Sequence, residues 1–316
     1  MKQETTKIKL NSFVDMLAAL PDDKACREYL ELKIWNGTPV CSHCGTVDET
    51  HYKLKVKGEF KGMYKCKHCR ERFTVTIGTM FEGSHIGLRK WFIAIYIFSL
   101  HKKGVSSHQL ASDLGITQKS AWFLLHRIRQ AFGQDKGNTL SNVVEIDETF
   151  MGGESKNKHT NKKKKNERGG TMHDQQPVLG MRERNGDVIA IVVPNRNKET
   201  LLPIILNTVE QDSTIMTDEY TAYKDLKHNY THQKVNHSAK EYVNQMAHTN
   251  GIENFWSHLK RGIDGIYHWC SKEHLQSYVD EFIFRFNIRN ASTNDKFDFS
   301  LTNSTKLTYK ELIKGK

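Results

Sequence analysis

Residues 248–262 read HTNGIENFWSHLKRG, and the rest of the chain is best interpreted outward from this stretch. At the helical period its apolar side chains fall on one stripe, formed by Ile252, Phe255, Trp256 and Leu259. Its polar side chains fall on another, formed by Asn250, Glu253, Ser257 and Lys260. We expect Asn250 to be the N-cap, because its side-chain carbonyl can accept an N–H of the first turn. Two helical turns bring Glu253 and Lys260 onto one face, although a solvated surface helix would have the same pattern.

The composition indicates a protein that binds a polyanion. The chain has 316 residues, enough for two or three domains, and a formal net charge of +11. An excess of this size favours a partner such as nucleic acid. The first ten residues, MKQETTKIKL, lack the apolar core of a signal peptide. The apolar run 91–100 is about half the ~20 residues that a membrane span needs, so we expect a soluble, cytoplasmic protein with no membrane partner.

Two CxxC pairs indicate a structural metal site. They are joined by a hairpin-length insert, and their members are Cys41, Cys44, Cys66 and Cys69. Four thiolates complete a tetrahedral zinc site without an open position, so this Zn²⁺ would be structural. Strands are expected at 52–56 and 60–64, around Gly58. Four unpaired core cysteines are the alternative, which the paired spacing disfavours.

Helices dominate the remainder of the first third. The pattern predicts helical structure over 11–35, interrupted at Pro21, and a buried helix over 88–100. The stretch SSHQLASDLGITQKSAWFLLHRIRQAF then predicts two helices joined by a turn at Gly115, which is the helix-turn-helix pattern. The second helix would enter the major groove of DNA, with side chains expected to contact DNA at Gln118, Lys119, Ser120 and Arg127. A helical hairpin without a DNA-binding role is the alternative.

From residue 143 the pattern changes to strands that carry acids. The strand VVEIDETF, 143–150, contains Asp147 and Glu148, which must point to opposite faces, so we expect only one of them to do chemistry. A hairpin around Asn185-Gly186 follows, then a helix over 198–209 and a strand over 213–218 that ends in Asp218. Further elements are expected at 220–226 (helix), 232–236 (strand) and 272–289 (helix). The basic loop 155–170 is expected to clamp nucleic acid, through Lys162, Lys163, Lys164 and Lys165.

This order of elements is the arrangement of an RNase H-like α/β domain with a mixed five-stranded sheet. Its acids, far apart in sequence, would converge at one edge of the sheet. In-line displacement at phosphorus uses two Mg²⁺ ions, and Mg²⁺ prefers carboxylate oxygens. Asp147 would bridge the ions, and Asp218 and Glu253 would each hold one. Lys260 would contact DNA near the reacting phosphate.

The chain resembles the bacterial insertion-sequence transposases of the DDE superfamily that have an N-terminal zinc ribbon. The matching stretches cover most of residues 20–290: VCSHCG, YKCKHCRERFTVTIGTMFEGSHIGLRKW, VEIDETFMGG, TDEYTAY, VNHS, HTNGIENFWSHLKRGIDGIYH and HLQSYVDEFIFRFNIRN. The joint occurrence of IDET, TDE and the helix containing LKR is specific. Some members of this group have asparagine as the third catalytic residue, whereas this chain has Glu253.

The resemblance implies Mg²⁺-dependent cutting and joining of DNA, with Mn²⁺ as a substitute. It implies a triad of Asp147, Asp218 and Glu253, accompanied by Lys260, with Arg261 beside it on DNA. The DNA partners would be the terminal inverted repeats of the element and a target duplex on the nucleoid. Because transposases act on synapsed pairs of ends, a homodimer or larger assembly is expected.

The expected organisation is α+β and multidomain. It comprises a helical segment (1–36), a zinc ribbon (37–80), a helix-turn-helix region (85–135), the RNase H-like domain (140–295) and a C-terminal tail (296–316). Two other functions fit the same residues: a DNA-binding regulator that has lost transposition, and a nuclease that cuts without joining. A zinc-ribbon transcription factor would leave the acids unexplained.

Overall fold

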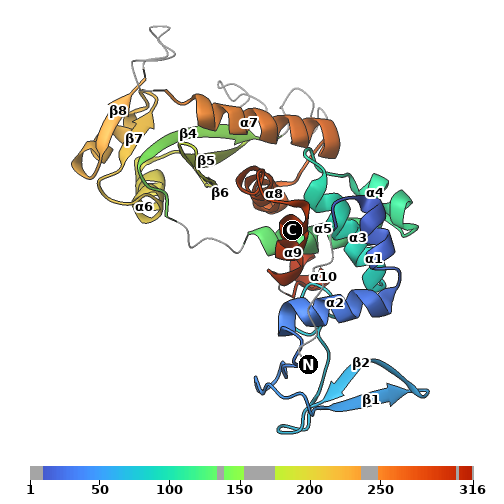
Figure 1. Cartoon of the computed structure of the whole chain (residues 1–316). Coiled ribbons are helices and arrows are strands. Elements are labelled where there is room, and N and C mark those ends of the chain that lie inside the picture. Colours follow the sequence, from blue (N-terminus) through green and yellow to red (C-terminus); the bar gives the residue numbers. More distant parts are fainter. Residues whose placement is uncertain (1–9, 134–138, 153–174, 236–247, 304–305, 315–316) are drawn as a thin grey trace. The chain divides into compact units, whose positions relative to one another are not determined.

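The computed structural model describes residues 10–133, 139–152, 175–235, 248–303 and 306–314, and it divides into two compact units. One unit comprises Met1–Gln134 with Asn290–Lys314, and the other comprises Asp135–Arg289 with the last two residues (Figure 1). Within the described ranges, no helix is both long and apolar enough to span a membrane. Residues 162–165, expected to bind DNA, lie outside these ranges.

The ribbon region forms a three-stranded antiparallel sheet in the order β1-β2-β3. Its strands are β1 (Tyr52–Val56), β2 (Glu59–Lys65) and β3 (Arg72–Phe73). Lys57 and Gly58 connect β1 to β2 with φ values of 51° and 84°, as a two-residue hairpin turn of matching twist requires. The two predicted strands are therefore confirmed, and β3 is a short addition that the sequence pattern did not indicate.

Helices of the first unit begin at recognisable caps. The N-terminal pair is α1 (Phe13–Ala19) and α2 (Asp23–Trp35), with Pro21 between them. Ser12 and Asp15 form a capping box on α1, and the Asp22 carboxylate accepts the Ala25 N–H at 2.8 Å to cap α2. The buried helix α3 (Leu88–Leu100) has its predicted bounds.

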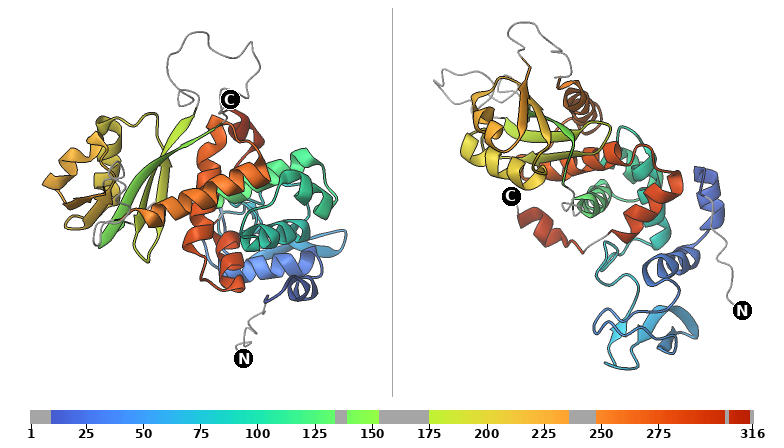
Figure 2. Two further views of the ribbon diagram at one scale, coloured as in Figure 1. Left: turned by 90° about the horizontal axis from the view of Figure 1, so that it is seen from above. Right: turned by 60° about the vertical axis from the view of Figure 1, so that its left-hand side comes forward.

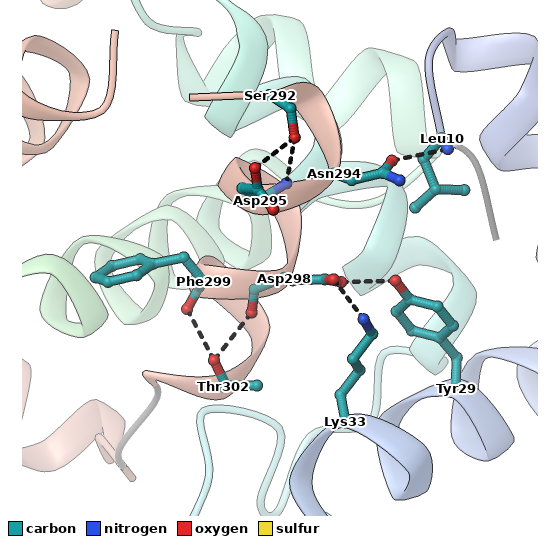
Figure 3. Close-up of polar contacts among 9 residues, drawn as sticks. All are labelled: Leu10, Tyr29, Lys33, Ser292, Asn294, Asp295, Asp298, Phe299 and Thr302. Carbon is teal, nitrogen blue, oxygen red and sulfur yellow. Dashed lines mark hydrogen bonds and ion pairs between the residues drawn. The ribbon is translucent and has the colours of Figure 1, made fainter. Parts of the chain in front are cut away.

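The tail expected at 296–316 is instead largely helical. It contains most of α9 (Thr293–Thr302) and the short α10 (Tyr309–Lys314). Phe297 is fully buried, and its ring packs against Tyr29 and Phe92. The Asp298 carboxylate accepts hydrogen bonds from the Tyr29 hydroxyl at 2.6 Å and the Lys33 ammonium at 2.5 Å (Figure 3). Because this apolar and ionic seam holds α9 against α2, the segment belongs to the core of the first unit.

Two helices joined by a tight turn follow α3. They are α4 (Ser107–Leu114) and α5 (Gln118–Phe132), and Gly115 between them has the left-handed φ of 59°. The hydroxyls of Ser106 and Thr117 accept the N–H groups of Gln109 and Ser120, respectively. The predicted secondary structure is thus present, and its action on DNA stays a prediction.

The second unit is built on a mixed five-stranded sheet in the order β6-β5-β4-β7-β8. Its strands are β4 (Val143–Met151), β5 (Gln176–Glu183), β6 (Val188–Val192), β7 (Thr214–Thr217) and β8 (Thr231–Lys234). The first three are antiparallel, whereas β7 and β8 run parallel to β4. Asn185, with φ of 63°, turns the predicted hairpin between β5 and β6. This is the RNase H-like arrangement expected from the sequence.

Helices cover both faces of this sheet. The helix α6 (Lys198–Thr208) and the 3₁₀ helix η4 (Thr221–His228) pack on one face around Val144 and Ile146. The helices α7 (Asn250–Gly262) and α8 (Leu275–Asn287) pack on the other, where Figure 2 shows α7 against the strands. The π-helical turn η6 (Ile263–Tyr267) and the 3₁₀ turn η7 (Lys272–His274) link α7 to α8. The buried residues of α7 are those of the apolar stripe read from the sequence, with glycines at its ends.

Candidate active site and zinc ribbon

Strand β4 sends its two neighbouring acids to different surroundings. The Asp147 carboxylate accepts a hydrogen bond from the Trp256 indole N–H of α7 at 3.0 Å. The Glu148 carboxylate instead lies near Tyr223 of η4, on the opposite face of the sheet. The alternation of a strand produces this division, as the sequence predicts.

Asp147 forms a cluster with two acids from other parts of the chain, Asp218 and Glu253. Burial, together with the negative charges of Asp218 and Glu253, raises the pKa of Asp147 to about 6. Asp218 follows the last residue of β7, and Glu253 lies in the first turn of α7. The structure therefore brings these predicted residues into one electrostatic cluster beside the C-terminal end of β7.

A protein donor holds one oxygen of each of the other two acids. The Tyr220 backbone N–H donates to Asp218 Oδ1 at 2.9 Å, which closes a tight turn after β7. The Thr249 hydroxyl donates to Glu253 Oε1 at 3.0 Å. These bonds restrict the rotamers of carboxylates that would otherwise move to relieve their repulsion.

Gly180 makes room for the indole that reaches Asp147. It lies opposite Asp147 in the β4–β5 register. A Cβ at this position would lie 2.4 Å from Trp256 Cζ2 and 2.9 Å from Ile252 Cδ1, both closer than atoms can approach. The missing side chain therefore allows α7 to lie close to the sheet beside the acid cluster.

Glu145 anchors the start of α7, a role that the sequence analysis missed. Its side chain is 1 % exposed, and it shares a face with Asp147 because the two are two positions apart on β4. Its carboxylate accepts the Ile252 N–H at 3.0 Å and the Arg184 Nε–H at 3.1 Å. His248 Nδ1 lies 3.3 Å away. A buried carboxylate from the sheet thus satisfies an N–H of the first turn of α7.

The N-cap predicted at Asn250 is wrong. Asn250 is the first residue of α7, and Thr249, at φ −114° and ψ 15°, occupies the cap position without a side-chain capping bond. Glu145 provides the missing acceptor, and Gly251 accommodates it. A Cβ on Gly251 would lie 2.5 Å from Glu145 Oε2 and 1.8 Å from Arg182 Nη1.

A fourth acid, Glu148, belongs to the same electrostatic group. Burial raises its pKa to about 7, and the charges of Asp218 and Asp147 act in the same direction. The hydroxyl of Tyr223 and the charge of Arg196 lower this pKa. Burial also raises the pKa of Tyr223 well above its usual value. The adjacent acids in the sequence pointed to Glu148, but only the strand order explains why it also interacts electrostatically with Asp218.

The basic residues of α7 lie on its solvent side. Lys260 and Arg261 are exposed, as is Glu253 two turns before Lys260. The Arg261 Nε–H donates to the Ser257 carbonyl at 2.9 Å, which aligns that side chain along the helix. Their predicted contacts with DNA remain predictions.

The predicted DNA-contacting residues of α5 fall into two groups. Gln118 and Lys119 at its start are exposed, and Ser120 is half-buried. Arg127 is 4 % exposed, donates to the Glu82 carbonyl at 2.6 Å and lies over the ring of Trp91. A guanidinium enclosed in this way has an internal structural role, so we do not retain Arg127 among the proposed DNA contacts.

The four cysteines of the ribbon have the spacing of a zinc site. Cys41 Sγ lies 3.6 Å from Cys69 Sγ, and Cys44 Sγ lies 3.7 Å from Cys66 Sγ. All four sulfurs lie within 4.8 Å of one another. A tetrahedral ion with Zn–S bonds of about 2.3 Å requires sulfurs separated by about 3.8 Å. The donor set therefore fits a tetrahedral Zn²⁺.

The acids are arranged differently from the cysteines. Among the described residues, the cysteines alone form a group of three or more metal-ligand side chains within 4.8 Å of one another. Asp147, Asp218 and Glu253 thus interact electrostatically but are more widely spaced.

The chain combines an RNase H-like domain that carries the acid cluster with a four-cysteine ribbon, and both parts match transposase domains. Residues 139–287 match the family of the ISXO2-like transposase domain, and residues 21–72 match the transposase zinc-ribbon domain. The chain belongs to this transposase family.

Relatives agree with this membership. The chain is 26 % identical over 262 residues to the "uncharacterized protein in transposable element ISH50" of Halobacterium salinarum, covering 79 % of this chain and 86 % of that protein. It is 39 % identical over 101 residues to an "uncharacterized transposase-like protein" of Haemophilus influenzae, covering 32 % of this chain and 80 % of that protein.

Solved structures add only distant likenesses. The Mos1 strand transfer complex matches with a TM-score of 0.30 at 9 % identity, over 69 % of this chain and 79 % of that one. A pre-cleavage Mos1 transpososome matches with a TM-score of 0.27 at 10 % identity, over 64 % and 75 %. Both TM-scores lie below 0.5.

Proposed function

We propose that this protein cuts the ends of an insertion sequence and joins them to target DNA. In the first reaction, water attacks the phosphorus at the element end and the O3′–P bond breaks, leaving a 3′-hydroxyl. That hydroxyl then attacks a phosphorus of target DNA and displaces the O3′ of the target strand. The observation that carries the proposal is the clustering of Asp147, Asp218 and Glu253, since each negative charge raises the cost of ionising Asp147.

The carboxylates fit a pair of Mg²⁺ ions. All three are hard oxygen donors, and their repulsion is a reason for divalent cations to bind there. Asp147, Asp218 and Glu253 would hold these ions, with Mn²⁺ as a substitute for Mg²⁺. When bound, the ions would activate the attacking oxygen and stabilise the leaving oxygen.

Other side chains would orient the acids and the DNA. The Trp256 indole N–H fixes one oxygen of Asp147, which determines how that carboxylate is presented. Lys260, exposed on the Glu253 side of α7, would contact a phosphate of the bound strand. Arg261 beside it would add a second phosphate contact.

The first unit would recognise the inverted repeats. The ribbon would be folded by Zn²⁺, and the exposed start of α5, Gln118 to Ser120, would read the major groove. The net charge of +11 favours binding to the DNA backbone, and the protein would act on the nucleoid in the cytoplasm. A homodimer or larger assembly would hold the two ends together.

A strand-transfer assay tests the proposal. A labelled duplex carrying the inverted repeat would be incubated with Mg²⁺ and wild type, Glu253→Gln or Asp218→Ala. We expect joined product with wild type alone, and end binding with all three proteins, because neither acid belongs to the DNA-reading unit. Equal activity of Glu253→Gln and wild type would show that Glu253 of α7 takes no part in the reaction.

Two outcomes would select the other functions. Cleavage by wild type without joining would indicate a nuclease, and specific binding without cleavage would indicate a regulator. Loss of end binding in Asp218→Ala would show that this residue supports the fold rather than the chemistry.

A further inference from the structure

Arg196 has an unusual position beside the acid cluster. It lies between the end of β6 and the start of α6, and it is half-buried. Its guanidinium carbon lies 4.8 Å from the ring centroid of Phe150 on β4 and 4.9 Å from that of Tyr220 after β7. Two aromatic rings from separate strand ends therefore hold one cation.

Tyr220 links this cation to the catalytic acid Asp218. Its backbone N–H donates to Asp218 Oδ1 at 2.9 Å, and its hydroxyl donates to the Arg196 carbonyl at 3.2 Å. One residue thus fixes both the acid and the backbone that carries the guanidinium. Phe150 shares a face of β4 with Glu148, so Arg196 lies on the Glu148 side of the cluster.

The guanidinium retains its hydrogen-bonding capacity. Aromatic rings contact the flat faces of a guanidinium, whereas its five N–H donors lie along the edge. In the part of the chain that the structure describes, no acceptor takes a hydrogen bond from these donors, and no carboxylate lies within 4.0 Å of them. Glu148 senses the charge of Arg196 only at longer range.

We propose that Arg196 is a phosphate-binding residue of the active site, its guanidinium edge taking two non-bridging oxygens of a DNA phosphate next to the reacting one. The proposal rests on the proposed function. Four carboxyl groups at this place disfavour the approach of the DNA backbone, and a fixed cation on their Glu148 side would offset part of that repulsion alongside the proposed metal ions. A planar fork held beside two aromatic rings suits the bidentate geometry of a phosphate, which a flexible ammonium does not reproduce.

The simpler explanation is that Arg196 only offsets the charge of Glu148. The two explanations differ in what happens when a single phosphate of the DNA is made neutral. Under the proposal, the residue and one phosphate are coupled partners. Under the simpler explanation, their effects are independent and multiply.

The test is a double-mutant cycle in which the cleavage rate is measured. One change is Arg196→Gln in the protein, and the other is a single neutral methylphosphonate in the duplex, placed at successive positions around the cleavage site. We expect one position at which neutralisation slows cleavage by wild type about tenfold to a hundredfold, the range for a charge-assisted hydrogen bond. At that position Arg196→Gln should show little further loss. Independent effects at every position would overturn the proposal.

Lys198→Gln is the matched control. It removes the same charge two residues away, but the Lys198 ammonium already pairs with Asp225. This variant should keep the full effect of the neutral phosphate. Arg196→Lys keeps the charge and loses the planar fork, so it should recover only part of the coupling. Recovery of full coupling in Arg196→Lys would refute bidentate binding.

The same cycle is to be measured on equilibrium binding with Ca²⁺ in place of Mg²⁺. If the wild type binds DNA but does not cut it, the proposed function is refuted, and the binding affinities still show whether Arg196 is coupled to one phosphate. If the wild type cuts DNA but neither measurement finds a coupled phosphate, only the proposed role of Arg196 is refuted. Circular dichroism of Arg196→Gln and Arg196→Lys would establish that both are folded.

Discussion

Replacing Glu145 with glutamine should loosen the start of the helix that carries Glu253. Glutamine preserves the shape of the side chain but turns one acceptor oxygen into an N–H₂ donor. Both oxygens of Glu145 are in use, one by the Ile252 N–H and the other by Arg184. Either orientation of the amide therefore places a donor against a donor, and Arg184 loses its counter-charge.

The size of the effect follows from burial. Glu145 is 1 % exposed, and the Arg184 side chain is 18 % exposed. Removing one partner of a buried ion pair destabilises a protein by about 3–5 kcal/mol. A loss of about 3 kcal/mol corresponds to a factor of roughly a hundred in the opening equilibrium of the affected segment.

Hydrogen exchange of the Ile252 amide measures this change locally, without requiring both units to unfold together. We expect protection of that amide to fall by about two factors of ten. Cleavage should weaken as well, because Glu253 lies in the same turn. Glu183→Gln is the control, since Glu183 is half-buried and accepts from Asn142 at 2.8 Å. Equal protection in both variants would refute a capping role for Glu145.

Three further outcomes are expected. Gly180→Ala should reduce the stability of the second unit by about 1–3 kcal/mol in urea denaturation, because its Cβ collides with Trp256; an unchanged midpoint would contradict the packing described. A zinc chelator, or Cys66→Ser, should unfold the ribbon and weaken end binding, as measured by metal content and gel shift; full affinity without metal would count against it. The pKa values of Asp147 and Glu148, about 6 and about 7, lie above their ordinary 3.8 and 4.5. The folded, Mg²⁺-free protein then binds more protons than the unfolded chain between about pH 4 and pH 7, so these groups make stability fall as pH rises through that window. The Tm of wild type should decrease more from pH 5 to pH 8 than that of Asp147→Asn/Glu148→Gln, and parallel profiles would refute the assignment.

Local spacing in the sequence was enough to predict most of the elements. The apolar stripe of α7 and the alternation in β4 are each encoded within a few neighbouring residues, so a period of 3.6 or 2 reveals which side chains are buried. The two CxxC pairs likewise predicted the thiolate cluster, because each pair positions its own two sulfurs. The acids were predicted from their places on strand, strand and helix, and the order of the strands brought them together.

Contacts between distant residues were decided by the tertiary structure. The N-cap of α7 could not be predicted from Asn250, because the acceptor comes from Glu145 on the sheet. Arg127 has the sequence pattern of a phosphate contact, but Trp91 and the Glu82 carbonyl enclose it. The aromatic clamp on Arg196 requires two strand ends far apart in the chain to meet. A sequence pattern specifies which face of an element is buried, whereas the partner of a buried polar group depends on which elements pack beside it.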